Sequence, residues 1–470
     1  MIKFSSYKLR GGIFVSMKDP EEIRDEIKNL IEAKNVRELR ALTEDMNDAD
    51  MADILEALEP EQSVILFRML GHDMAAEVFA HLIPDAKEAL VSQLTAPELG
   101  RIVDELFLDD AADLVEELPA DVVKRVLESA SPETRRGINQ LLQYQEDSAG
   151  SIMTTEYISL KPDMNVEESF RHIREVGTDK ETLYTCYVTD PRGVLIGVVT
   201  VRTMLLSQYA DKIADIMTDT NIISVNTNDD REKVTELFQK YDFMAIPVVD
   251  SQNHLVGIVT VDDAMEVLEE ESTEDFHKMA AILPIDEPYL SMGVIELAKK
   301  RIIWLMVLMI SATLSGQILN HYQSVFAAIP ALIAAIPMLM DTGGNAGSQS
   351  STLVIRGIAV GELKIFDALK VLSKEIRVSL MVGGGLAIVN FFYKYAMSGD
   401  FLLSLTVGIS LFATVIFAQT IGGMLPLLAK ALGFDPALMA APIVTTIVDA
   451  GSLTMYFMVA SEVMRIGVSS

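Results

Sequence analysis

The distribution of apolar residues divides the chain at about residue 301. From Ile302 to Met340 no side chain carries a formal charge, and this run is roughly twice the ~20 apolar residues that one membrane-crossing helix needs. Because hydrocarbon offers no hydrogen-bond partners to backbone N–H and C=O groups, such a run must be helical. The pattern predicts an all-α transmembrane domain over 299–470 with five helices, at about 302–320, 324–341, 372–397, 401–429 and 436–462.

The beginning of the chain has the pattern of a soluble helical domain. Between residues 20 and 145, apolar side chains recur every three or four positions with charged residues between them, which is the period of an amphipathic helix. Several units begin with proline and an acid, as in Pro60-Glu61, Pro97-Glu98 and Pro132-Glu133, and both are favoured in the first turn of a helix. These repeats predict an acidic, all-α superhelical N-domain over residues 20–145.

Residues 146–268 contain one pattern twice. The first copy opens with Ile152-Met153-Thr154 and the second with Ile216-Met217-Thr218, and each continues through a helix-like stretch into two short strands. Strand, helix, strand, strand and helix in duplicate predict a compact α/β pair. The opening motifs, with Pro247-Val248-Val249-Asp250 and Gly257-Ile258-Val259-Thr260-Val261, resemble a tandem of cystathionine-β-synthase (CBS) domains. The resemblance implies a ligand- or ion-sensing module, and since some such pairs bind adenine nucleotides, ATP is a candidate ligand.

Charge is distributed as unevenly as hydrophobicity. The formal net charge is −30, yet residues 301–470 hold only 8 of the 68 acidic side chains and 9 of the 38 basic ones. The acidic excess of the preceding residues argues against nucleic acid as a partner, since nucleic-acid binding needs basic side chains that neutralise phosphates. It favours attraction of cations, although a solvated acidic surface explains the same excess.

Several other classes are disfavoured. The single cysteine, Cys186, excludes an intrachain disulfide. Met1 to Lys18 lacks the apolar core and cleavage site of a secretory signal, so the soluble part is expected in the cytoplasm. We expect no enzymatic activity, because the sequence has no nucleophile–base arrangement and no His-Glu-x-x-His spacing.

Basic residues at the ends of the apolar segments set the orientation. Residues 299–301 are basic and precede the first segment, several more lie between the second and third, and Lys430 follows the fourth; the opposite ends have only Lys394 and Arg465. Positive charge marks the cytoplasmic side. We expect a multi-pass protein of the cell (inner) membrane, in contact with lipid, with its N-terminus in the cytoplasm and its C-terminus outside.

The segment before the first apolar run, 269–298, is predicted to be a connecting helix. Six carboxylates lie within ten residues, at its start and just before it, and they repel one another unless a cation neutralises them. A divalent cation suits such a cluster because hard cations take oxygen ligands, and a solvated connecting helix is the alternative. The six are Glu266, Glu269, Glu270, Glu271, Glu274 and Asp275.

Asp449 is the acid predicted to lie deepest in the membrane. It follows Asp435 by 14 residues, which is ~21 Å along a helix. A carboxylate there costs several kcal/mol unless it faces water or a cation, and such acids are functional by default; pairing with a neighbouring helix is the alternative. The run Gly343-Gly344-Asn345-Ala346-Gly347 lacks the lysine of a phosphate-binding loop, so we expect tight helix packing or a helix end there.

Taken over nearly all of its length, the chain resembles the MgtE-type magnesium channels. The match rests on the order of domains, on Pro337 with the Gly343–Gln349 motif, and on Asp435-Pro436-Ala437 leading to Thr445-Thr446-Ile447-Val448-Asp449. The resemblance implies a homodimer with a pore on its two-fold axis, where Asp449, Asn345 and the Thr445 carbonyl hold a hydrated Mg2+. It further implies regulatory Mg2+ sites at Glu77, Asp109, Asp113, Glu232, Asp242, Asp263, Glu266, Glu271, Glu274 and Asp275.

These observations favour a Mg2+-selective channel or transporter for Mg2+ uptake that cytoplasmic Mg2+ closes. At low Mg2+, repulsion between acidic surfaces would separate the soluble domains, whereas bound ions would hold them in a closed arrangement. Two other hypotheses remain. One is a carrier that exchanges a divalent metal for Na+ or H+, and the other is a membrane protein whose CBS pair senses a nucleotide.

Overall fold

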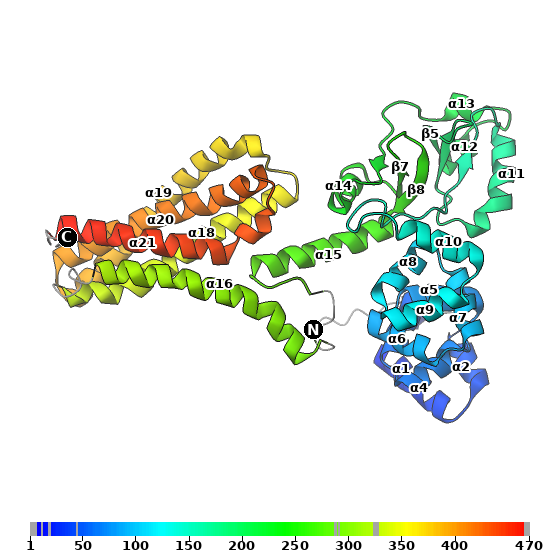
Figure 1. Cartoon of the computed structure of the whole chain (residues 1–470), viewed down its shortest axis with the longest axis horizontal. Coiled ribbons are helices and arrows are strands. Elements are labelled where there is room, and N and C mark those ends of the chain that lie inside the picture. The colour runs from blue at the N-terminus through cyan, green and yellow to red at the C-terminus, as the bar shows by residue number, and fades with distance from the viewer. Residues whose placement is uncertain are drawn as a thin grey trace. The chain divides into compact units, whose positions relative to one another are not determined.

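The computed structural model describes residues 7–10, 13–16, 20–43, 46–285, 289, 292–322 and 329–464 (Figure 1). The chain folds as two compact units, Met1–Met265 and Glu266–Ser470. The first unit has a helical part followed by an α/β part, and the second is helical. This order of elements confirms the predicted fold class. Helix α15 (Val261–Met279) begins in the first unit and continues into the second.

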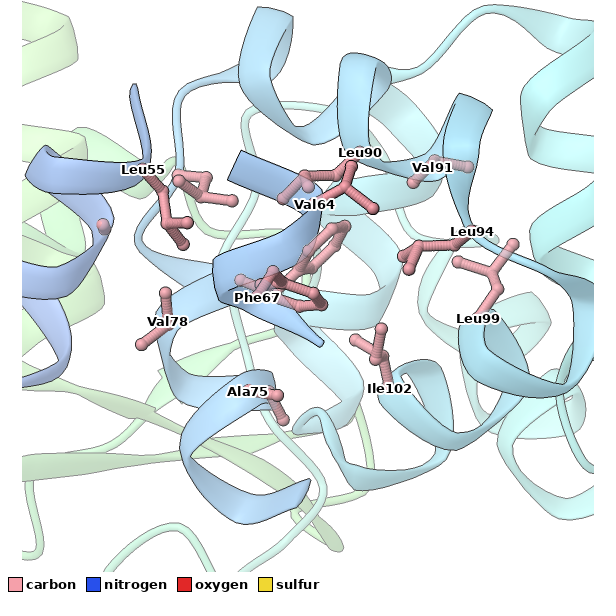
Figure 2. Packing of buried hydrophobic residues seen from close by; sticks show 14 of the residues in the cluster. Leu55, Val64, Phe67, Ala75, Val78, Leu90, Val91, Leu94, Leu99 and Ile102 are labelled. Carbon is pink, nitrogen blue, oxygen red and sulfur yellow. The ribbon is translucent and has the colours of Figure 1, made fainter. Parts of the chain in front are cut away.

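The helical part of the first unit is a stack of short helices that follows a hairpin of β1 (Tyr7–Arg10) and β2 (Ile13–Ser16). Apolar side chains such as Leu55, Phe67 and Val78 meet in one continuous core (Figure 2). Prolines open helices as predicted, for each of α4, α6 and α10 starts with one. The helices are α1 (Pro20–Glu32), α2 (Val36–Thr43), α3 (Asp48–Glu56), α4 (Pro60–Phe67), α5 (His72–Ala80), α6 (Pro84–Gln93), α7 (Ala96–Glu105), α8 (Leu108–Glu117), α9 (Ala120–Ser129) and α10 (Pro132–Leu141).

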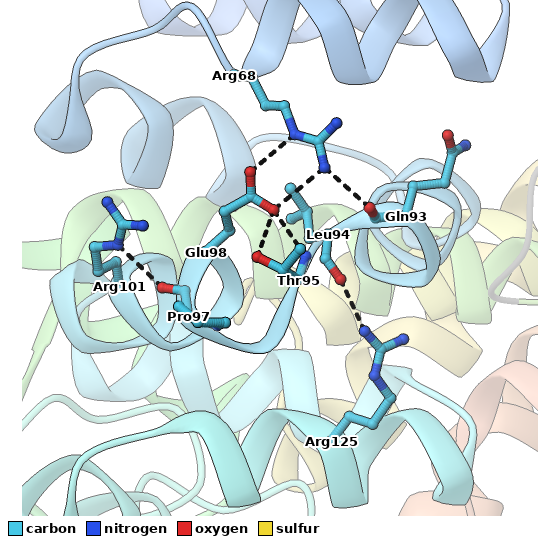
Figure 3. Close-up of polar contacts among 8 residues, drawn as sticks. All are labelled: Arg68, Gln93, Leu94, Thr95, Pro97, Glu98, Arg101 and Arg125. Atoms are coloured by element: carbon cyan, nitrogen blue, oxygen red, sulfur yellow. Dashed lines mark hydrogen bonds and ion pairs between the residues drawn. The ribbon is translucent and has the colours of Figure 1, made fainter.

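Polar contacts join neighbouring helices of this stack (Figure 3). Arg68, just after α4, donates to both carboxylate oxygens of Glu98 at 2.9 and 3.2 Å and to the Gln93 carbonyl at the end of α6. Glu98 also accepts the Thr95 N–H and so completes a capping box at the start of α7. These hydrogen bonds, with that of Arg68 the largest, lower the pKa of Glu98 to about 2. This acid therefore serves the fold.

The α/β part consists of two copies of the predicted repeat that pack on each other. Each sheet has a parallel and an antiparallel pair, in the orders β3-β4-β5 and β6-β7-β8. Met217, from the motif that opens the second copy, packs on Gly197 of the first, and Met153 packs on Gly257 of the second. A Cβ on either glycine would lie 2.5 or 2.6 Å from the methionine sulfur, so the two repeated motifs form part of the contact between the copies. The elements are β3 (Ser159–Leu160), α11 (Val166–Val176), β4 (Thr185–Thr189), β5 (Leu195–Thr200), α12 (Val201–Leu206), α13 (Ile213–Ile216), β6 (Val225–Asn226), α14 (Arg231–Tyr241), β7 (Ala245–Val249) and β8 (Leu255–Thr260).

The second unit contains the apolar helices. Among the described residues, four segments are long and apolar enough to cross a membrane: Val294–His321, Ile365–Ser398, Phe401–Ala431 and Pro436–Val463. They match four of the predicted segments. The bounds predicted for the second segment, 324–341, were wrong. Residues 323–328 lie outside the described residues, and the helix that follows runs to Ala359. The elements are α16 (Val294–His321), η2 (Pro330–Ala335), α18 (Ile336–Ala359), η3 (Ile365–Asp367), α19 (Ala368–Ser398), α20 (Phe401–Ala431), η4 (Pro436–Met439) and α21 (Ala441–Val463).

Glycines bring α18 close to α20 and α21. A Cβ on Gly343 would lie 2.7 Å from Thr414 and 3.0 Å from Val448, and one on Gly422 of α20 would clash with the Gly347 carbonyl oxygen. Such close approach favours helix association in a membrane, where van der Waals packing replaces the hydrophobic effect. The glycine-rich motif is therefore a packing site inside a continuous helix, and the alternative of a helix end was wrong.

Candidate functional site

One face of α18 carries polar side chains that the other described residues leave uncovered. Asp341, Asn345 and Gln349 are exposed, and their four-residue spacing places them on one face of the helix. The intervening glycines lie on the buried side, against α20 and α21. A polar stripe within a bilayer is costly unless it meets water or another protein surface.

Helix α21 brings the other predicted residues to the same place. A Cβ on Gly344 would lie 3.0 Å from Thr445 Cγ2, so α21 crosses α18 beside Asn345. Thr445 and Asp449 are one turn apart and partly exposed. The Thr445 hydroxyl donates to the Pro442 carbonyl at 3.0 Å. Within the part of the chain that the structure describes, no hydrogen bond or ion pair reaches the Asp449 carboxylate.

A second group of charged side chains lies at the end of α15. Lys278 Nζ contacts Glu274 Oε2 and Asp435 Oδ2, both at 2.8 Å. Beside this ion pair, burial and then the Asp435 carboxylate raise the pKa of Asp275 to about 6. Asp435 also caps η4 by accepting the Ala437 N–H at 2.8 Å. The predicted ligands Glu274 and Asp275 therefore belong to one charged group, which also contains Lys278.

The turn η4 joins this charged group to the helices that carry Asn345 and Asp449. The carbonyl of Met439, its last residue, accepts a hydrogen bond from Ser351 Oγ of α18 at 3.0 Å, and the chain then enters α21. Contacts therefore run without a break from α15 through Asp435 and η4 to both α18 and α21. A displacement of α15 has a physical route to those helices.

In the first unit, the predicted ligands Asp109 and Asp263 lie in an acidic cluster with Asp110 and Glu181. Asp109 is buried, with 7% of its surface exposed, and neither its Oδ1 nor Glu181 Oε2 has a hydrogen-bond partner. Burial and then the Asp263 carboxylate raise the pKa of Asp109 well above its usual range and that of Glu181 to about 8. Buried carboxylate oxygens without partners fit a bound cation, since native structures satisfy nearly all such atoms.

The other predicted regulatory residues are spread over several helices. Glu232 and Asp242 lie near opposite ends of α14, ~15 Å apart at ~1.5 Å per residue. No three His, Cys, Asp or Glu side chains among the described residues are arranged to hold a metal ion. A regulatory cation would therefore need waters or further ligands. The remaining predicted residues are Asp113 on α8, Glu77 on α5, and Glu266 and Glu271 on α15.

Family profiles match most of the chain. The profile described as the MgtE intracellular N domain matches residues 46–147, the CBS domain profile matches 149–208 and 213–270, and the MgtE divalent cation transporter profile matches 336–459. The magnesium transporter MgtE of Thermus thermophilus is 37% identical over 444 residues, which are 94% of this chain and 98% of that protein. The chain belongs to the MgtE family. The magnesium transporter MgtE of Bacillus subtilis is 28% identical over 92% of this chain and 95% of that protein.

Two solved structures resemble about half of this MgtE-family chain. The cytosolic domain of the Mg2+ channel MgtE in complex with ATP has a TM-score of 0.50 and 34% identity, and covers 52% of this chain and 99% of that one. The structure of the soluble part of a magnesium transporter has a TM-score of 0.51 and 28% identity, and covers 54% of this chain and 100% of that one. MgtE proteins are transporters rather than enzymes, and the apolar helices of the second unit mark a multi-pass membrane protein.

Sequence reasoning missed charged residues that stand beside the predicted sites. Lys278 follows Glu274 by four residues, which is the spacing of a helical ion pair, so part of its role was readable from the sequence. Asp435 and Glu181 are brought in from distant parts of the chain. Asp435 belongs to a motif that the family resemblance uses, but only the fold places it beside Lys278 and places Glu181 beside Asp109.

Proposed function

We propose that this chain is a Mg2+ channel or transporter for Mg2+ uptake across the cell membrane, which works as a homodimer and is closed by cytoplasmic Mg2+. The observation that carries the proposal is the exposed polar face of α18 beside the Asp449 carboxylate of α21. The Thermus thermophilus relative, a magnesium transporter, matches this chain over nearly its whole length.

A dimer would complete the ion path. Mg2+ loses water reluctantly and is usually held by few carboxylates and several retained waters. One Asp449 per chain is too little for such a site, whereas a two-fold axis beside α18 and α21 would bring two copies of it together. The Asn345 amide and the Thr445 carbonyl would then accept hydrogen bonds from the hydration shell.

Closure of the ion path would depend on Mg2+ binding to the acidic side chains of both units. The unpartnered oxygens of Asp109 and Glu181 suit a cation that binds at the helical and CBS parts of the first unit. In the second unit, Glu274, Asp275 and Asp435 stand where contacts lead to α18 and α21. Ions that bind the closed arrangement better than the open one would shift the population toward closure. We further propose that the soluble part lies in the cytoplasm and that the C-terminus lies outside.

The CBS pair is proposed as a site for ATP. Support comes from the cytosolic MgtE domain that was solved with ATP, to which this chain is 34% identical. Calorimetric titration of the purified protein with ATP tests this part. A flat titration at millimolar ATP would remove the nucleotide from the account and leave the proposed ion path unaffected.

The pore assignment is tested by Asp449→Asn, which keeps the shape of the side chain and removes its charge. We expect Mg2+ uptake by vesicles that contain the purified variant to fall by about tenfold or more, since one charge–ion contact is worth at least ~1.4 kcal/mol in a low-dielectric pore. Asp400→Asn is the matched control, because Asp400 caps α20 at the α19–α20 hairpin. Uptake at the unsubstituted level by Asp449→Asn would refute the assignment.

A further inference from the structure

An apolar groove lies between α19 and α20, away from the polar face of α18. Its volume is about 330 Å3, and every residue that lines it is apolar. Gly384 and Gly408 line it and have no side chains to fill the space, and Phe391 and Phe412 line it as well. Phe391 is held in place by Phe401, with ring centroids 5.6 Å apart.

The position of the groove along the helices matches one leaflet of a bilayer. The lining residues of α19 lie 6 to 14 residues before Ser398, where that helix ends, which is ~9–21 Å along it at ~1.5 Å per residue. Half of a ~30 Å hydrocarbon core is ~15 Å. The groove therefore extends along the hydrocarbon depth of the leaflet next to the α19–α20 hairpin.

A cation stands at the hairpin end of the groove. Lys394 follows Phe391 by three residues, so it lies about one turn closer to the hairpin on the same side of α19. Within the described residues no carboxylate pairs with it, and the nearby Asp400 is used to cap α20. An apolar slot with a cation at its water-facing end is complementary to a lipid chain with a phosphate.

We propose that this groove binds one acyl chain of a phospholipid from the hairpin-side leaflet, whose phosphate contacts Lys394. A second copy of the chain is the less favoured occupant. Helix α19 packs on α20, whereas α21 packs on α16, α18 and α20, so the groove belongs to a different helix pair from the polar face assigned to the dimer.

Photolabelling tests the proposal in the intact protein. The full chain is placed in phosphatidylethanolamine vesicles that contain phosphatidylglycerol with a diazirine on one acyl chain, and labelled peptides are mapped by mass spectrometry. We expect the label in 384–392 and 405–412. Gly384→Leu, whose side chain would project toward Phe412, should reduce labelling of these peptides about fivefold or more, because it removes the acyl chain's contacts in the groove. Lys394→Gln should reduce it by a smaller factor, because it removes the phosphate contact alone.

The controls use the same chemistry outside the groove. Gly385 has nothing within 4 Å of a built Cβ and does not line the groove, so Gly385→Leu should label like the unsubstituted protein, as should Lys394→Arg. Equal labelling in Gly384→Leu and Gly385→Leu would overturn the proposal. So would a change in oligomeric state with Gly384→Leu and no label in the groove, which would identify a second copy as the occupant. Neither readout depends on ion flux.

Discussion

Replacing Lys278 with methionine tests whether this lysine competes with a regulatory cation. Its ammonium contacts Glu274 and Asp435 at 2.8 Å each, and Asp275 stands beside them. Methionine keeps much of the apolar stem and removes the charge. The carboxylates then face one another without a cation of the chain's own, so we predict that Lys278→Met binds Mg2+ at this group more tightly.

The size of the effect follows from exposure. The side chains of Lys278, Glu274 and Asp435 are 21%, 33% and 31% exposed, which places the two ion pairs above the median surface value but within about 0.5–1 kcal/mol each. Losing both ion pairs would strengthen Mg2+ binding by about 1–2 kcal/mol, which lowers the Mg2+ concentration at the binding midpoint roughly 5- to 30-fold. The effect should shrink at high salt, because partly exposed charges are screened.

The assay is Mg2+-dependent hydrogen exchange of peptides from α15 and η4 in the full-length protein, with Mg2+-dependent inhibition of uptake measured in parallel. Lys370→Met is the matched control. It breaks an ion pair with Asp367 of the same 2.8 Å length, which lies at η3, away from the carboxylates around Lys278. A Lys278→Met midpoint equal to or above that of the unsubstituted protein would refute the competition.

Two further predictions concern stability. Burial and then the Asp263 carboxylate raise the pKa of Glu181 from 4.5 to about 8. The contribution of Glu181 to the free energy of unfolding is therefore fully present below pH 4.5 and is lost as pH rises toward 8. Glu181→Gln should therefore raise the melting temperature of the Mg2+-free protein at pH 8 by several degrees and change it little at pH 4.5; no difference between the two pH values would contradict this. Gly422→Ala places a Cβ against the Gly347 carbonyl oxygen and should cost about 1–3 kcal/mol or more, seen as a lower melting temperature in detergent, whereas Gly385→Ala, in open space, should not. Equal melting of the two alanine variants would show that the helices separate there at no cost.

The features that the sequence predicted well depend on local pattern. Proline and acid at the starts of helices, and the paired Ile-Met-Thr motifs of the CBS copies, act within a few residues or repeat at a constant interval. Met153 and Met217 turned out to pack on Gly257 and Gly197. This contact explains why the motifs occur as pairs, although the pairing across copies could not be read from either motif alone.

The features that the sequence did not predict depend on packing. Glycine, asparagine and serine are weak helix formers, so the Gly343–Gln349 motif gave no sign that α18 continues to Ala359; close packing on α20 and α21 outweighs the weak propensity. Glu181 and Asp435 reach their clusters from distant parts of the chain. Asp449 and Asn345 stay predictions as pore residues, and the structure places them on α21 and α18, which pack on each other.

The most direct measurement of the central claim is Mg2+ flux through the purified protein in vesicles, with Mg2+ varied on the side of the soluble domains. The account predicts flux that follows the electrochemical gradient of Mg2+ alone, falls as Mg2+ rises on that side, and is lost in Asp449→Asn. Flux that needs an opposing Na+ or H+ gradient would indicate a coupled carrier. An absence of Mg2+ flux in vesicles that contain correctly folded protein would contradict the account.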